Sequence, residues 1–302
     1  MSLSQSSCRF LPVFFLGTLV LLGGLASVCA ADEGSATTQR AGSNFDRDQL
    51  VAWCIVPFDA KNRGPAERAE MVAGLGLKRV AYDWRDQHIP TFEEEILQYK
   101  KHGIEYFAFW SWHDSMEPLI RKHNIHPQIW MMFGEPAGTQ EEKVAAAAAS
   151  LLPMVEKTKS LGLKLGLYNH GGWSGEPANM VAVCQYLKDH HGAENVGIVY
   201  NLHHGHDHIP DFRQQLELLK PWLICLNLNG MNDRAEPKIL PIGSGKHEQS
   251  LIRIIHELNY TGPVGIIDHR EELDAEESLR QNLSGLPGIL KEVGNPKSAE
   301  TY

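Results

Sequence analysis

The sequence predicts an α/β fold, a single closed barrel of eight parallel strands with helices between them, a (β/α)8 barrel. Short apolar runs alternate with segments whose apolar residues recur at helical spacing, which is typical of parallel βα units. About 270 residues follow a predicted export segment, a length that suits one such barrel. No glycine-rich phosphate loop follows the first strand, as a dinucleotide-binding open sheet would need, so closure is favoured.

Eight apolar runs predict the strands, and helical patterns lie between them. On one predicted helix Phe212, Leu216 and Leu219 share a face, and glycines such as Gly103 and Gly192 follow the periodic stretches as stop signals. The loops after the strands are longer than those before them, which places a site at the carboxyl ends of the strands. The predicted strands are residues 50–56, 79–83, 106–110, 128–133, 164–169, 196–200, 223–227 and 264–267.

The first thirty residues are typical of an export signal. Arg9 precedes an apolar run that extends to Leu25, and small residues up to Ala30 indicate cleavage there. The run is shorter than the roughly twenty residues that span a bilayer, although an uncleaved anchor is the alternative. We expect a periplasmic or secreted protein without stable membrane association after cleavage. The predicted parts are a signal peptide (1–30), a flexible leader (31–48), the barrel (49–294) and a flexible tail (295–302).

Composition and charge exclude several classes of protein. Charged residues at 22% and hydrophobic residues at 43% are those of an ordinary globular domain rather than of a disordered or coiled-coil chain. Without residues 1–30, which hold one basic and no acidic residue, the net charge is −10 rather than −9. Nucleic acid is therefore not expected as a partner. Cys54, Cys184 and Cys225 lie in apolar stretches and are odd in number, which favours buried thiols over a disulfide framework.

Polar side chains and tryptophans follow the predicted strands. Asp83 and Arg85 come after the second strand, and His113 and Glu135 come after the third and fourth. Aromatic faces cover the apolar side of a sugar, while amides and imidazoles meet its hydroxyls, so this pattern predicts a pocket for a polyhydroxy ring. The candidate substrate-binding residues are Trp110, Asn169, Trp173, Asn201, Asn227, Asn229 and His206.

Four histidines fall within residues 203–208, directly after a strand, and Asp268-His269 follows the last strand. Neutral imidazoles and a neighbouring carboxylate are metal ligands, whereas the alternative is that some of these residues cap the next helix or lie on the rim. Glu176, in the glycine-rich stretch 168–177, is a candidate general base or the residue that begins a helix at Pro177. The candidate metal ligands are His170, His203, His204, Asp268 and His269.

From about Leu50 to Leu290 the chain resembles the xylose isomerase-like TIM-barrel superfamily of sugar-phosphate isomerases and epimerases. The stretches that carry the likeness are Val80-Ala81-Tyr82-Asp83-Trp84-Arg85, Asn201-x-x-His204, Leu240-Pro241-Ile242-Gly243-Ser244-Gly245 and Tyr260-Thr261-Gly262-Pro263-Val264-Gly265.

The resemblance implies proton transfer between carbons next to a carbonyl, with a divalent ion (Mn, Zn, Co or Mg) held at the barrel mouth. The superfamily holds that ion with carboxylates and a histidine after strands five to eight, and this chain departs from the pattern. The corresponding places hold Asn169 or His170, then Asn201, then Asn227 or Asn229, then Asp268 or His269. Loss of carboxylates disfavours a hard ion, so softer metals or none are expected. An imidazole, His170 or His204, would take over the proton transfer, with Glu176 on the substrate side.

Two functions from different classes follow. The first is an exported sugar isomerase or epimerase, or a lyase on a keto-sugar, with His170, His204 and Glu176 as catalytic residues. The second is a non-catalytic sugar-binding barrel in which loss of the carboxylates marks lost chemistry. An endonuclease of the same superfamily is disfavoured by the charge of −10. A phosphorylated substrate is disfavoured because Lys246 and Arg270 are the obvious cations of the late loops.

Overall fold

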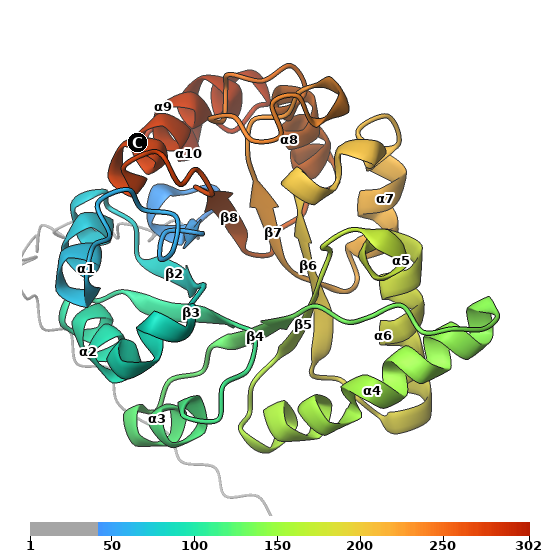
Figure 1. Cartoon of the computed structure of the whole chain (residues 1–302). Helices are drawn as coiled ribbons and strands as arrows, with labels where there is room; N and C mark the ends of the chain where they lie inside the picture. The colour runs from blue at the N-terminus through green and yellow to red at the C-terminus, as the bar shows by residue number, and fades with distance from the viewer. Residues whose placement is uncertain (1–41) are drawn as a thin grey trace, which may run out of the picture. The chain divides into compact units, whose positions relative to one another are not determined.

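The computed structural model describes residues 42–302, which form a closed barrel of eight parallel strands surrounded by helices (Figure 1). The strands are β1 (Val51–Trp53), β2 (Arg79–Tyr82), β3 (Glu105–Trp110), β4 (Gln128–Met131), β5 (Leu165–Tyr168), β6 (Val196–Asn201), β7 (Leu223–Leu228) and β8 (Val264–Ile267). The α-helices are α1 (Pro65–Gly74), α2 (Phe92–Lys101), α3 (Met116–His123), α4 (Gln140–Ser160), α5 (Gly172–Gly175), α6 (Pro177–His191), α7 (Phe212–Leu219), α8 (Glu248–Glu257), α9 (Ala275–Glu292) and α10 (Pro296–Ala299). Short 3-10 helices are η1 (Arg47–Gln49), η2 (Asp86–Thr91), η3 (Leu202–His204), η4 (His206–His208) and η5 (Asp233–Ala235).

Each strand pairs in parallel with its neighbour in the chain, and β8 closes the barrel against β1, where Val51 lies opposite Gly265. The predicted (β/α)8 barrel is confirmed, and every predicted strand overlaps an observed one. The first strand is shorter than predicted because Cys54 takes a left-handed backbone conformation, with φ 60°, and leaves the strand. That turn sends the chain into the loop that carries Phe58.

Aromatic side chains fill the barrel beneath its carboxyl-terminal mouth. The ring of Trp53 lies 4.8 Å from that of Trp130 and 5.7 Å from that of Trp110, and Tyr168 lies 4.7 Å from Trp110, between ring centroids. Gly166 makes room for this layer, since a Cβ there would lie 2.9 Å from Trp130 and 2.7 Å from a Val199 methyl. The floor of the mouth is therefore rigid and apolar.

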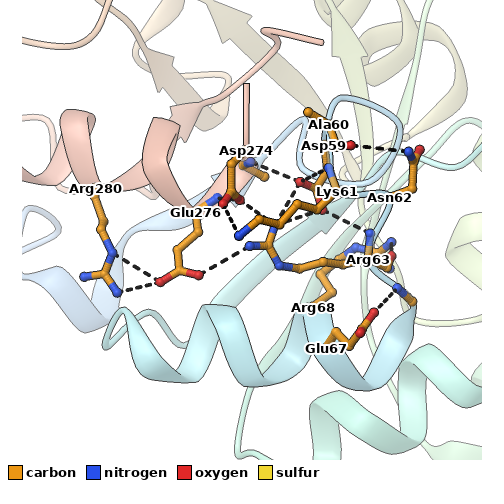
Figure 2. A network of polar contacts seen from close by, with 12 residues as sticks. Asp59, Ala60, Lys61, Asn62, Arg63, Glu67, Arg68, Asp274, Glu276 and Arg280 are labelled. Atoms are coloured by element: carbon orange, nitrogen blue, oxygen red, sulfur yellow. Dashed lines mark hydrogen bonds and ion pairs between the residues drawn. The ribbon is translucent and has the colours of Figure 1, made fainter. Parts of the chain in front are cut away.

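The loop after β1 and the loop after β8 are joined by a network of ion pairs (Figure 2). Arg63 pairs with Asp59 at 2.8 Å, with Asp274 at 2.6 Å and with Glu276 at 3.3 Å. Lys61 also pairs with Asp274, at 2.6 Å. Burial alone would raise the pKa of Asp274, but hydrogen bonds from Arg63 and Lys61 lower it below its ordinary value. We call this network the loop clamp, and it ties the first strand's loop to the last.

Both ends of the described chain are packed, where the sequence predicted a flexible leader to residue 48 and a flexible tail from residue 295. Phe45 is 2% exposed, and the Tyr302 hydroxyl donates to its carbonyl oxygen at 2.9 Å. Ser298 and Ala299 of α10 are buried. Polar composition does not reveal that the two ends pack against each other. The predicted signal peptide and the leader through residue 41 lie outside the described residues. Among the helices of residues 42–302, none has the length and apolar character needed to cross a membrane.

Candidate active site at the barrel mouth

A cavity of about 70 Å³ lies at the carboxyl ends of the strands, where barrels of this kind hold their sites. Its walls come from β1, β2, β3, β5, β6 and β8 or from the loops directly after them. The lining residues are Trp53, Cys54, Phe58, Asp83, Arg85, Trp110, Tyr168, His170, His203, His204 and His269.

Four histidine rings form a chain along one side of this cavity. The His170 and His204 ring centroids are 4.4 Å apart, those of His203 and His204 are 3.6 Å apart, and those of His203 and His269 are 5.4 Å apart. His170 is exposed, His204 and His269 are half-buried, and His203 is 2% exposed. The chain of rings therefore runs from solvent into the barrel, and we call it the histidine row.

Burial keeps the imidazoles of His203, His204 and His269 neutral. It lowers the pKa of His204 to about 3 and that of His269 to about 4, and it lowers the pKa of His203 well below its ordinary value. Nearby positive charge, chiefly other imidazoles and Lys238, acts in the same direction. These three imidazoles are therefore unprotonated at neutral pH, and each binds a proton more weakly than a free imidazole does.

Two buried carboxyls lie beside the row, and burial favours their protonated forms. It raises the pKa of Asp83, which lines the cavity, to about 7, although Arg85 opposes the change. It raises the pKa of Asp268 to about 8, against a hydrogen bond from Ser278 and the charge of Arg270. Burial likewise raises the pKa of the Cys54 thiol, and the charges of Asp83 and Asp268 add to that shift. The cavity therefore combines neutral bases with carboxyls that retain protons near neutrality.

Several buried polar atoms at this cavity have no hydrogen-bond partner among residues 42–302. They are Trp53 Nε1, Asp83 Oδ2, His203 Nδ1 and His269 Nδ1. Because a buried polar atom without a partner costs free energy, a convergence of such atoms on one cavity points to a polar ligand rather than to a structural role. The site offers donors and acceptors together, as a polyhydroxy molecule requires.

The structure brings together part of the residue set predicted from the sequence. Five of the predicted residues line the cavity: Trp110, His170, His203, His204 and His269. Asp268 directly precedes His269 in the chain and is fully buried.

Asn169 and Asn201 join the ends of β5 and β6. The Asn169 amide donates to the Asn201 carbonyl oxygen at 3.1 Å and accepts from the Asn201 backbone N–H at 2.7 Å. The Asn201 amide donates to the Tyr168 hydroxyl at 2.5 Å, and both asparagines are buried. These amides hold Tyr168 and the start of the histidine row in place.

Other predicted residues lie elsewhere on or beneath the rim. Glu176 precedes α6, is exposed, and its carboxylate lies 3.0 Å from His208 Nε2, outside the residues that line the cavity. Trp173 packs against Phe133 and donates to Gln140 at 2.9 Å. Glu176 therefore begins a helix, as the alternative interpretation had it.

His206 lines a separate cavity of about 390 Å³ formed with η5 and α8, and its Nδ1 lies 3.1 Å from the His203 carbonyl oxygen. Asn227 is fully buried, and its side-chain oxygen occupies the space that a Cβ at Gly265 would fill. Asn229 donates to the carbonyl oxygen of Gly230 at 2.8 Å and supports the long loop after β7. Asn229 thus supports the backbone of its loop, whereas Asn227 fills the space beside Gly265.

The sequence analysis assigned no role in the site to three residues that line the cavity: Trp53, Cys54 and Phe58. Phe58 lies five residues past β1, and only the fold of the loop shows that it reaches the mouth. Asp83 and Arg85 were among the polar residues predicted to follow the strands. The pattern that could have marked them as site residues is an acidic and a basic side chain directly after β2. Cys54 is buried as predicted, and it also lines the cavity.

The family model of the xylose isomerase-like TIM barrel matches residues 99–287, from α2 into α9. The chain belongs to this family. The match covers more than half of the chain and includes β3 to β8. No curated protein matches the sequence.

Solved structures of xylose isomerase-like barrels share the fold at low identity. A structure of L-ribulose 3-epimerase has a TM-score of 0.64 and 12% identity, and the match covers 83% of this chain and 96% of that chain. The 3-keto-D-glucoside 4-epimerase YcjR from E. coli has a TM-score of 0.58 and 12% identity, over 80% and 98% of the two chains. The IolI protein, solved with a bound zinc atom, has a TM-score of 0.62 and 12% identity, over 81% and 98%. The fold is therefore of the type that sugar epimerases use, and these likenesses establish the fold alone.

The residues at the mouth do not fit the divalent ion that the family resemblance implies. Within residues 42–302, no group of three or more His, Cys, Asp or Glu side chains is arranged to hold a metal ion. The ends of β5 and β6 carry amides in place of carboxylates. The Asn169 side-chain oxygen accepts from the Asn201 backbone N–H, and the Asn201 side-chain nitrogen donates to Tyr168, whereas Asn201 Oδ1 has no partner within residues 42–302. Carboxylate oxygens are what a hard ion prefers, so these neutral amides disfavour one. The ligand set predicted from the sequence stays a prediction, and the proposed proton transfer uses protein side chains alone.

Proposed function

We propose that this protein is an exported enzyme that moves a proton at a carbon next to the carbonyl of a sugar or oxidised sugar, and that it epimerises or isomerises that substrate. The observation that carries the proposal is the placement of a neutral base and a protonated acid on opposite strands. His204 follows β6 and Asp83 follows β2, and these strands face each other across a ring of eight. Both residues line the one cavity.

Opposed groups are what inversion at a carbon needs. A base on one face removes the proton next to the carbonyl, and an acid on the other face returns a proton, which inverts the centre. In this site the His204 imidazole takes the proton, and the Asp83 carboxyl supplies one from across the cavity. The buried Trp53 Nε1–H, which has no partner in the described chain, is a donor for the substrate oxygen on which charge develops.

His170 completes the base side of the site. Its ring lies 4.4 Å from that of His204 and is exposed, so it links the buried imidazole to solvent. A proton taken by His204 can leave along the histidine row, and solvent protons can return to Asp83 after turnover. Delivery of a proton to the neighbouring carbon would give isomerisation instead of epimerisation, and in both reactions the abstracted hydrogen exchanges with water when it leaves His204 before a proton is delivered.

Hydrogen exchange with solvent tests the proposal. Candidate aldoses, ketoses and uronic acids are incubated in heavy water, and loss of the proton signal next to the carbonyl is followed by NMR. We expect wild-type exchange to fall at least about 100-fold in the double variant His170→Ala/His204→Ala and in Asp83→Asn. His247→Ala is the matched control, because His247 pairs with Asp233 outside this cavity. Unchanged exchange in the folded double variant contradicts the proposal.

A non-catalytic sugar-binding barrel is the second candidate. The observation that favours it is the pair of amides at Asn169 and Asn201, where the family resemblance implies carboxylates. In that case the wild-type protein binds a sugar measurably, and neither wild type nor Asp83→Asn exchanges any substrate hydrogen.

A further inference from the structure

Arg85 places a cation with free donors in the cavity wall. Its Nη1 donates to the carbonyl oxygens of Asp83, at 3.4 Å, and Trp84, at 2.8 Å, and its guanidinium carbon lies 5.5 Å from the centroid of the Phe58 ring. Within residues 42–302 it forms no ion pair, and its Nε and Nη2 donate no hydrogen bond. A guanidinium held at one edge, with its other donors free, has the fork geometry that recognises a carboxylate.

Lys238 brings a second cation to the same mouth. Its neighbour Ile239 packs against the cluster that contains Trp53, Trp110 and Tyr168, and its carbonyl oxygen accepts from Asn229 at 3.5 Å. Lys238 is exposed and lies on the loop after β7, next to the residue that reaches this cluster. It forms no ion pair within the described part of the chain.

We propose that the substrate is a sugar acid, whose carboxylate is bound by Arg85 and Lys238 while its carbonyl end occupies the cavity between His204 and Asp83. This inference rests on the proposed function and names its substrate class. The cavity of about 70 Å³ admits only one end of a sugar, so the remaining atoms lie over the rim where the two cations are. Both cations are exposed at the rim and form no ion pair within residues 42–302, so each is open to an anion that approaches from solvent.

A carboxylate fits this site better than a phosphate. Phosphate sites collect several cations or backbone N–H groups around a charge near −2, whereas Arg85 here offers one fork of donors. Asp83 and Asp268 are buried beside the cavity, and a dianion would drive both carboxyls further toward protonation than a single charge would. A ligand with one negative charge therefore leaves Asp83 better able to exchange its proton.

Calorimetric titration with defined sugars tests the inference. D-glucuronate, D-glucose and D-glucose 6-phosphate share a ring and differ in charge. We expect D-glucuronate to bind wild type at least about tenfold more tightly than the other two sugars, since a hydrogen bond to a charged group is being gained. Arg85→Gln should remove that preference, Arg85→Lys should restore part of it, and Lys238→Gln should reduce it several-fold.

Lys246→Gln is the matched control, because Lys246 lies on the same loop but pairs with Asp233. It should leave the preference unchanged. Equal affinity for acid and neutral sugars, tighter binding of the phosphate, absence of glucuronate binding, or an unchanged preference in folded Arg85→Gln each overturns the inference. The proposed function fails by a different measurement, because hydrogen exchange into a neutral sugar can persist when the acid preference is absent.

Discussion

The ring of Phe58 stacks on the ring of His269, with centroids 3.9 Å apart and planes 26° apart. Phe58 comes from the loop after β1 and His269 from the loop after β8, so the stack lies where the barrel closes. The Arg85 guanidinium lies over the Phe58 ring, 5.5 Å from its centroid. The stack therefore joins the histidine row to the cation that we assign to substrate binding.

Replacement of Phe58 by alanine should release His269. Phe58 is 7% exposed, so its truncation should lower the free energy of unfolding by about 3 kcal/mol. Because burial is the chief cause of the low pKa of His269, about 4, the pKa should rise toward the ordinary value of about 6.5. NMR titration of the His269 imidazole measures the change. Phe133→Ala, which opens a contact with Trp173 instead, should leave His269 unchanged, and an equal shift in both variants contradicts the role of the stack.

The loop clamp should contribute to stability as well as to the site. Arg63→Met leaves the buried carboxylate of Asp59, 3% exposed, without its cation, although backbone N–H groups still donate to it. We expect the free energy of unfolding to fall by about 2–4 kcal/mol in urea denaturation. Arg280→Met is the control, since its pair with Glu276 is half exposed and should cost less than about 0.5 kcal/mol. Equal losses in the two variants contradict a clamp.

Sequence patterns were sufficient to predict the barrel because each strand and helix is specified by the residues within it. Eight apolar runs with helical segments between them specify βα units, and the histidines after β6 lie at the mouth as their position past a strand predicts. Which of the residues past a strand enter the cavity is decided by loop packing. Phe58 and Glu176 illustrate this, since Phe58 reaches the mouth from a loop turned at Cys54, whereas Glu176 is turned outward to begin α6.

The asparagines at the strand ends show a second limit of prediction from the sequence. Asn169, Asn201 and Asn227 lie at the register positions where the resemblance implied ligands, and all three are buried in contacts that hold neighbouring strands. An amide at such a position can meet a sugar hydroxyl or a backbone group, and the residue type does not distinguish them. Gly265 on β8 has no Cβ and so leaves space for the Asn227 side chain on β7. The pattern of either strand alone does not reveal this contact.

Removal of divalent metal should leave catalysis unchanged. The proposed proton transfers use His204 and Asp83, and the ends of β5 and β6 carry the neutral amides of Asn169 and Asn201 where a hard ion would need carboxylates. We expect protein dialysed against a chelator to retain its hydrogen-exchange rate within about twofold, a difference of less than about 0.5 kcal/mol. Loss of exchange that returns on addition of Mn²⁺, Zn²⁺, Co²⁺ or Mg²⁺ contradicts this and restores the ligand set that the sequence suggested.

The two buried carboxyls should make stability fall as pH rises above neutrality. Their folded pKa values, about 7 for Asp83 and about 8 for Asp268, exceed the ordinary value of 3.8. The folded state therefore holds protons that the unfolded chain has lost. The stabilisation is complete below the unfolded pKa and is lost as pH rises through the folded pKa. Between pH 6 and pH 8 the free energy of unfolding should fall by on the order of 3 kcal/mol through these groups.

Urea denaturation at successive pH values, with the double variant Asp83→Asn/Asp268→Asn beside wild type, isolates this contribution. The variant should lose most of the decline above pH 6, whatever its stability at pH 6, because amides do not titrate. Asp114→Asn, at a side chain that is 91% exposed, should keep the wild-type slope. The pKa values of His203, His204 and His269 are lowered in the folded protein, so below pH 6.5 these imidazoles bind protons in the unfolded chain before they do so in the folded one. They therefore lower the free energy of unfolding as pH falls below 6.5. A wild-type slope in the double variant shows that neither carboxyl changes its protonation between pH 6 and pH 8. It would also remove Asp83 as the proton donor, because a carboxyl that does not titrate near neutrality cannot give and regain a proton during turnover.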